Sequence, residues 1–108
     1  MNLPTEIFGD VIVVHTPDEF GPDQGEQFAP YVARLERRNV VVDLDNTEML
    51  DSGALTALLD AQDALRGEAG QVKIAASNSV NRKILEITRL DQRLEVFDSV
   101  VDAVKSFR

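Results

Sequence analysis

The chain has 108 residues, of which 44% are hydrophobic and 28% charged, with no cysteine, one histidine and a formal net charge of −8. This length suits one domain, and the missing cysteine excludes disulfides, thiol nucleophiles, iron–sulfur clusters and cysteine-bound zinc. The acidic balance argues against a nucleic-acid-binding protein, because contact with phosphates needs a basic surface. No apolar run approaches the roughly 20 residues of a membrane span and no signal peptide is recognisable, so we expect a cytoplasmic protein without membrane insertion.

Five short runs predict the strands of a sheet, in chain order residues 6–8, 11–14, 40–44, 72–76 and 94–97. The first run is weak, and the turn pair Gly9 and Asp10 predicts that it forms a hairpin with the second. The second and third runs are continuously β-branched and do not alternate with polar residues. This pattern is typical of strands that are covered on both faces.

Apolar residues at helical spacing predict a helix after each of the last four strands. Their apolar faces are Phe28, Tyr31, Val32 and Leu35; Leu55, Leu58, Leu59 and Leu65; Val80, Ile84 and Ile87; and Val100, Ala103, Val104 and Phe107. Pro30 either lies early in the first helix or kinks its middle, and the sequence leaves both open. Gly67 and Gly70 follow the second helix, where a glycine stop is expected.

This alternation of strands and helices predicts the α/β fold class. We expect a single domain over residues 1–108 with a central mixed sheet of four to five strands and about four helices. The sheet should be largely parallel after the N-terminal hairpin, with right-handed crossovers.

Most of the functional signal lies in residues 40–66. The strand there ends near Leu44, and a polar loop leads to Asp51, Ser52 and Gly53 at the start of a helix. Ser52 is placed to be the helix N-cap, with its hydroxyl accepting a hydrogen bond from an amide one turn in. Asp51 would favour the positive end of the helix dipole, and Gly53 would leave bare backbone for another protein to approach. Helix capping alone would also account for these three residues.

Three segments of the chain resemble the STAS domain family, the family of the bacterial anti-sigma factor antagonists. They are VVDL with MLDSGAL (residues 41–44 and 49–55), ASNSV with ILEITRLD (76–80 and 84–91), and VFDS followed by Ala103 (96–99). The likeness covers about residues 7–107. Separate segments that agree in the right order are more specific than Asp-Ser-Gly alone, and they imply a STAS-like domain.

The resemblance implies a regulatory binding module and not an enzyme, with no catalytic residue, cofactor or metal of its own. Ser52 matches the serine that an anti-sigma factor with serine kinase activity phosphorylates in that family, and the kinase partner binds the ATP. The unphosphorylated antagonist binds the anti-sigma factor and releases the sigma factor. A phosphate adds roughly −1.5 to −2 charges at pH 7 and should end that binding without unfolding the domain. The expected partner-binding residues are Met49, Asp51, Ser52 and Gly53, in a monomer or weak homodimer.

One position departs from the family pattern. The family commonly has a second Ser or Thr after Asp-Ser and then Gly, whereas Gly53 follows Ser52 directly and Ala54 stands at the usual glycine position. An alternative hypothesis is therefore a STAS scaffold that is not phosphorylated, a subunit of a larger signalling or transporter assembly in which Ser52 only caps a helix. The family's acidic position after the second strand is assigned to neither Asp18 nor Asp23.

Two further groups have functional alternatives. His15 is the chain's only histidine, and we expect it to be a structural or surface group. The carboxylates of Asp43, Asp45, Glu48 and Asp51 cluster where open α/β sheets bind their ligands. A divalent cation could bind there, but a solvated acidic loop is favoured because the spacing does not match the twelve-residue calcium loop.

Overall fold

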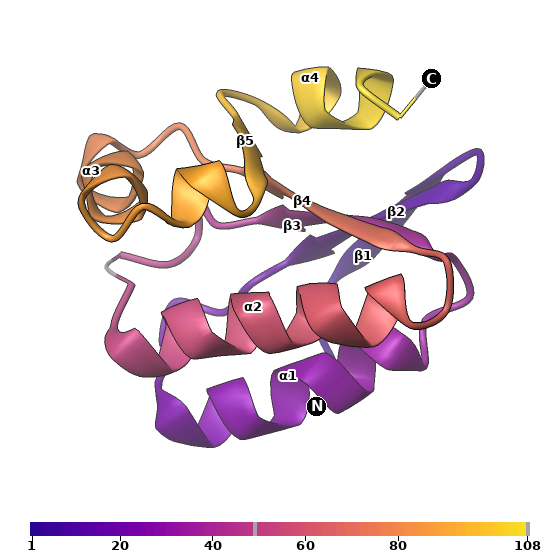
Figure 1. Ribbon diagram of the computed structural model, residues 1–108, viewed down its shortest axis with the longest axis horizontal. Coiled ribbons are helices and arrows are strands. Elements are labelled where there is room, and N and C mark those ends of the chain that lie inside the picture. Colours follow the sequence, from indigo (N-terminus) through magenta and orange to yellow (C-terminus); the bar gives the residue numbers. More distant parts are fainter. Residues whose placement is uncertain (49, 108) are drawn as a thin grey trace.

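A five-stranded sheet lies at the centre of the computed structural model, which describes residues 1–48 and 50–107 (Figure 1). The strands are β1 (Thr5–Phe8), β2 (Val11–His15), β3 (Asn39–Asp43), β4 (Gln71–Ala75) and β5 (Glu95–Phe97). They lie in the sheet in the order in which they follow one another in the sequence. β1 pairs with β2 antiparallel, and every later pair is parallel. The predicted α/β fold class with a mixed sheet is confirmed.

The predicted hairpin joins β1 to β2. Gly9 in the turn has φ of +64°, a left-handed backbone that glycine adopts without a steric penalty. The strands pair from Thr5 opposite Val14 to Phe8 opposite Val11. β1 is an edge strand whose residues are exposed, so the protected part of the sheet begins at β2.

Helices lie on both faces of the sheet, as Figure 1 shows: α1 (Pro22–Ala33) and α2 (Ser52–Arg66) on one face and α4 (Val100–Lys105) on the other. The remaining helix α3 (Ser79–Ile87) and a short 3₁₀ helix η1 (Leu90–Gln92) lie between β4 and β5 in the chain. Pro30 lies inside α1, which ends three residues later at Ala33. In the described part of the chain, no helix is long and apolar enough to cross a membrane.

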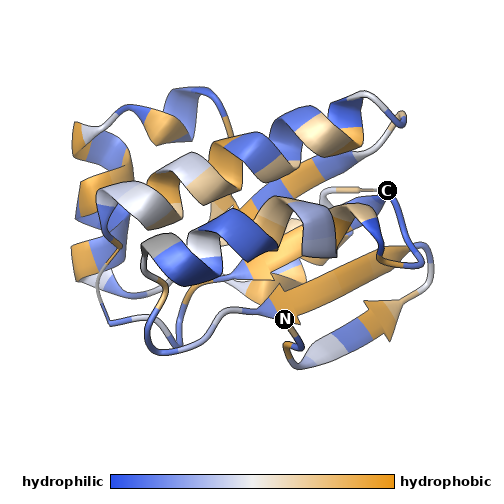
Figure 2. Ribbon diagram, turned by 90° about the horizontal axis from the view of Figure 1, so that it is seen from below, coloured by the Kyte–Doolittle hydropathy of each residue, from blue (hydrophilic) through white to orange (hydrophobic). Residues whose placement is uncertain are grey.

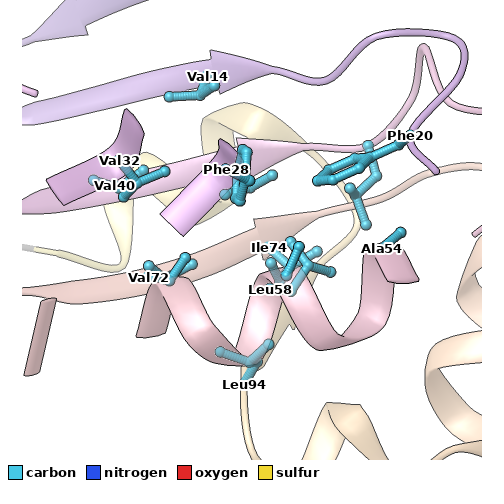
Figure 3. Packing of buried hydrophobic residues seen from close by; sticks show 14 of the residues in the cluster. Val14, Phe20, Phe28, Val32, Val40, Ala54, Leu58, Val72, Ile74 and Leu94 are labelled. Carbon is cyan, nitrogen blue, oxygen red and sulfur yellow. The ribbon is translucent and has the colours of Figure 1, made fainter. Parts of the chain in front are cut away.

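The larger core lies between the sheet and the pair α1 and α2. Val14, Val40 and Val72 point from the strands toward Phe28 of α1 and Leu58 of α2 (Figure 3). All five side chains are buried. The three valines point toward the helices because side chains alternate along a strand, and the even-numbered residues of β2, β3 and β4 face α1 and α2. Figure 2, seen from the side of α1 and α2, shows hydrophilic and hydrophobic residues alternating along these helices and mostly hydrophobic strands behind them.

The predicted apolar face of α3 is not its buried face. Val80 and Ile87 are 50% and 69% exposed, and only Ile84 of the predicted stripe packs partly against the core. The structure buries Asn81 and Leu85 instead. A polar residue therefore occupies the inward side of this helix, and its hydrogen bonds explain the orientation, as described below.

Candidate functional site

The candidate site is the corner between β3 and α2. Asp51 is the residue that caps α2: its backbone is extended and its Oδ1 accepts a hydrogen bond of 2.8 Å from the amide of Ala54. The prediction that Ser52 is the N-cap is therefore wrong by one residue. A carboxylate serves as a cap as well as a hydroxyl does, and once Asp51 occupies the cap position Ser52 becomes the first helical residue.

Ser52 is exposed at the start of α2. Its hydroxyl forms no hydrogen bond to any residue in the described ranges 1–48 and 50–107. It lines a hollow of about 330 Å³ between α1 and α2, together with Gly25, Glu26, Gly53, Thr56 and Asp60. Ser52 is therefore not needed to cap α2, and its hydroxyl is accessible from outside the protein.

Gly53 lies against α1. A Cβ on Gly25 of α1 would lie 3.0 Å from the carbonyl oxygen of Gly53, so the two helices approach each other closely at these glycines. The bare backbone of Gly53 thus serves contact within the molecule on this side. Gly53 remains partly exposed beside Ser52, and its role in partner binding remains a prediction.

Carboxylates surround the corner. A second hollow, of about 570 Å³, is lined by Asp18, Glu19, Asp23, Glu48 and Asp51 together with Phe20, Gly21 and Gln24. Glu26 and Asp60 line the hollow that contains Ser52. The region around the serine is therefore strongly acidic, and it attracts a basic surface and repels a further negative group.

Three buried polar side chains hold the loop before Ser52 in place. The Asn81 side chain donates to the Thr47 carbonyl (2.7 Å) and accepts from the Leu50 amide (3.1 Å). The Thr47 hydroxyl donates to the Pro17 carbonyl (2.6 Å) and lies 2.7 Å from the hydroxyl of Thr16. Sequence reasoning missed these three polar residues. The one available signal was Asn81 between the apolar residues Val80 and Ile84 of the third helix, and it does not reveal what Asn81 contacts.

His15 links three strands on the α4 side of the sheet. Its Nδ1 lies 2.7 Å from Asp43 Oδ2, and its Nε2 lies 2.7 Å from Glu6 Oε1. Burial lowers the pKa of His15, but the hydrogen bonds and charges of the two carboxylates outweigh it, so the pKa lies above its ordinary value of 6.5. His15 is thus a structural group, as predicted.

Two carboxylates of the acidic cluster near the strand ends, Asp43 and Asp45, accept hydrogen bonds within the protein. Asp43 accepts hydrogen bonds from His15 and from the amide of Asp45, and Asp45 accepts from the amide of Ser77 at 2.8 Å. Among the described residues, no group of three or more His, Asp or Glu side chains could hold a metal ion. Leu50 is buried in the core, and Met49 lies outside the described residues.

A model of the STAS domain family matches residues 5–103 of the chain. A STAS-domain containing protein of Pseudomonas aeruginosa (strain UCBPP-PA14) is 36% identical over 78 residues, which make up 72% of this chain and 77% of that protein.

Solved structures show the same fold. An anti-sigma factor antagonist from Mycobacterium paratuberculosis matches with a TM-score of 0.78 at 22% identity, over 97% of this chain and 92% of that one. The anti-sigma factor antagonist SpoIIAA in its unphosphorylated form matches with a TM-score of 0.77 at 14% identity, over 99% and 96% of the two chains. The phosphorylated form of SpoIIAA from Bacillus matches with a TM-score of 0.70 at 14% identity, over 99% and 100%. Because the family model matches residues 5–103, nearly the whole length, the chain belongs to the STAS domain family.

Proposed function

We propose that this protein is an anti-sigma factor antagonist that binds an anti-sigma factor with serine kinase activity and is switched by phosphorylation of Ser52. The observation that carries the proposal is the exposed Ser52 hydroxyl at the first position of α2, which does not cap the helix. In the described part of the chain it has no internal hydrogen-bond partner. A partner can therefore reach this oxygen without disturbing the cap at Asp51.

Phosphorylation is a transfer from ATP bound by the partner. The Ser52 Oγ attacks the γ-phosphorus, the bond to the β–γ bridging oxygen breaks, ADP leaves and the hydroxyl proton passes to a base on the kinase. This chain supplies the acceptor hydroxyl. The acidic surroundings of the serine, with Asp51, Glu26 and Asp60 close by, fit a partner whose contacting surface is basic.

The phosphate would act as a switch by repulsion at the interface. It adds roughly −1.5 to −2 charges at pH 7 to a surface that already carries several carboxylates. The start of α2 offers its helix dipole to the phosphate, which offsets part of the repulsion within the protein. The fold should therefore persist while the affinity for the partner falls. The two solved forms of SpoIIAA, unphosphorylated and phosphorylated, both share this fold and support the same expectation here.

A pull-down from native extract tests the binding. The baits are the wild-type protein, Ser52→Asp and the control Ser99→Asp. Ser99 caps α4 by accepting from the amide of Asp102, and aspartate can keep that cap while it adds the same charge elsewhere. We expect the wild-type and Ser99→Asp baits to retain a kinase that Ser52→Asp loses.

The kinase recovered in this way is then incubated with the protein and ATP, and the phosphate is mapped by mass spectrometry. We expect it on Ser52, and Ser52→Ala should remain unlabelled. A phosphate absent from Ser52, together with unchanged binding of Ser52→Asp, contradicts the switch. Baits that retain assembly or transporter subunits whatever the charge at Ser52 would instead favour the scaffold hypothesis.

A further inference from the structure

We infer that Asn81 of α3 is the positioning residue of the Ser52 corner: it fixes the loop that presents the serine, and phosphoryl acceptance depends on it. The inference rests on the proposed function of Ser52. Its basis is geometric, since the Asn81 side chain is fully buried and bonds the backbone of that loop at two points.

The two bonds of Asn81 fix the loop immediately before the N-cap. Its Nδ2 donates to the Thr47 carbonyl at 2.7 Å and its Oδ1 accepts from the Leu50 amide at 3.1 Å. One planar amide therefore sets the separation and orientation of two backbone groups three residues apart. Leu50 directly precedes Asp51, so this bond fixes where the capping residue, and hence Ser52, begins the helix.

The opposite side of the same loop is held by hydroxyl groups. Thr47 donates to the Pro17 carbonyl at 2.6 Å, and Thr16, also buried, contacts both the Thr47 hydroxyl and the Asp43 carbonyl. The carbonyl of Thr47 is thus tied to α3 and its side chain to the loop after β2. Hydrogen bonds therefore hold the described loop residues Thr47 and Leu50 in place.

A buried amide has a desolvation penalty that an apolar side chain at the same position would avoid. Asn81 sits one helical turn before Leu85 on the inward side of α3, where a leucine would pack without hydrogen bonds. The amide of Asn81 instead pairs with the Thr47 carbonyl and the Leu50 amide. Its benefit is therefore the fixed shape of the corner rather than apolar burial.

The chain offers a matched control at the other end of α2. The buried side chain of Gln62 accepts a hydrogen bond of 2.8 Å from the amide of Val72 at the start of β4. Gln62→Leu and Asn81→Leu each replace a buried side-chain amide that bonds the backbone by leucine. Only Asn81→Leu removes an amide that contacts the loop before Ser52.

Hydrogen exchange of the isolated protein tests the positioning directly. In Asn81→Leu we expect the amides of Leu50 and Ala54 to exchange about tenfold faster or more, because the first loses its acceptor and the second depends on the position of Asp51. In Gln62→Leu the faster exchange should be confined to Val72 and its neighbours. An unchanged Ala54 amide in Asn81→Leu overturns the inference. If Asn81→Leu does not fold, Asn81→Ala, which removes the same two hydrogen bonds without adding apolar volume, replaces it under the same criteria.

Phosphoryl transfer tests the consequence, with the kinase recovered in the pull-down. We expect kcat for Asn81→Leu to fall about tenfold, because a misplaced acceptor loses the reactive geometry, while Gln62→Leu keeps the wild-type kcat. Equal loss in both variants, or none in Asn81→Leu, overturns the inference and leaves Ser52 as the acceptor. If no kinase acts on the wild-type protein, the proposed function fails, and the exchange experiment alone decides the positioning role of Asn81.

Discussion

The two faces of the sheet are stabilised in different ways. On the face that α1 and α2 cover, twenty of the described residues form one buried apolar cluster. On the face that α4 covers, the corresponding cluster has five described members, among them Val11, Val13 and Ala103. α4 is only six residues long, and its Val101 and the neighbouring Phe8 of β1 are exposed.

Charged and polar contacts take the place of apolar burial on the α4 face. Lys73 of β4 is buried there, with its Nζ 4.3 Å from the ring centre of Phe107, 2.8 Å from Ser106 Oγ and 3.1 Å from Glu95 Oε2. His15 lies on the same face between two carboxylates. This comparison teaches that the stability of one face depends on packing volume, whereas that of the other depends on ionisation and salt.

Adjacent residues of β2 give the largest test of the comparison. Val14 faces the α1 and α2 side, Val13 faces the α4 side, and both side chains are fully buried. We expect Val14→Ala to lower the free energy of unfolding by roughly 2.5 kcal/mol and Val13→Ala by about 1 kcal/mol. The short helix α4 can shift to fill part of the cavity left at Val13, whereas the large core under α1 and α2 cannot fill the cavity left at Val14. Urea unfolding of both variants measures the difference, and equal losses would contradict it.

Much of the fold followed from local sequence patterns. Continuous β-branched runs predicted β2 and β3, since parallel strands covered on both faces need apolar residues on both, and mixed apolar runs predicted β1, β4 and β5. The first two helices followed from apolar residues at a spacing that forms one face. The face of α3 did not, because Val80 and Ile87 form a regular stripe but remain exposed, whereas Asn81 is buried.

The candidate site was predictable in its location and less so in its detail. Asp51 and Ser52 are both good capping residues and adjacent, so local propensity could not decide which one caps α2. Asn81 contacts Leu50 and Thr47, which lie 31 and 34 residues away in the sequence. No local pattern encodes such contacts, because they arise only when α3 folds onto the loop.

A double-mutant cycle on the α4 face measures the contribution of one charged contact there, and its expected effect is of intermediate size. Lys73→Met keeps the length of the side chain and removes its charge, and Phe107→Leu removes the ring. We expect a coupling of about 1 kcal/mol in the free energy of unfolding, because a desolvated ammonium over a ring gains cation–π energy. The matched cycle of Lys73→Met with Phe28→Leu, across the sheet, should give about zero. Equal coupling in the two cycles would refute a specific contribution from the Lys73–Phe107 pair.

The smallest expected effect is a pH dependence that only the α4 face should show. The folded-state pKa of His15 lies above its ordinary value of 6.5. The folded state thus holds the proton more tightly than the unfolded state, and the stabilisation is fully present below pH 6.5. It is lost as the pH rises through the higher folded-state pKa. His15→Gln should therefore destabilise the protein more at pH 5.5 than at pH 8.5, as measured by urea unfolding.

The two carboxylates that face His15 should contribute unequally to this effect. The side chain of Asp43 is 11% exposed and that of Glu6 is 56% exposed, so solvent and salt screen the second contact more. Glu6→Gln should weaken the pH dependence. Added salt should also weaken the pH dependence, and this effect of salt should be larger in the wild-type protein than in Glu6→Gln. Val14→Ala, on the opposite face, should keep the wild-type pH profile at lower stability. A profile that flattens in Val14→Ala as much as in His15→Gln would show that the two faces do not contribute independently.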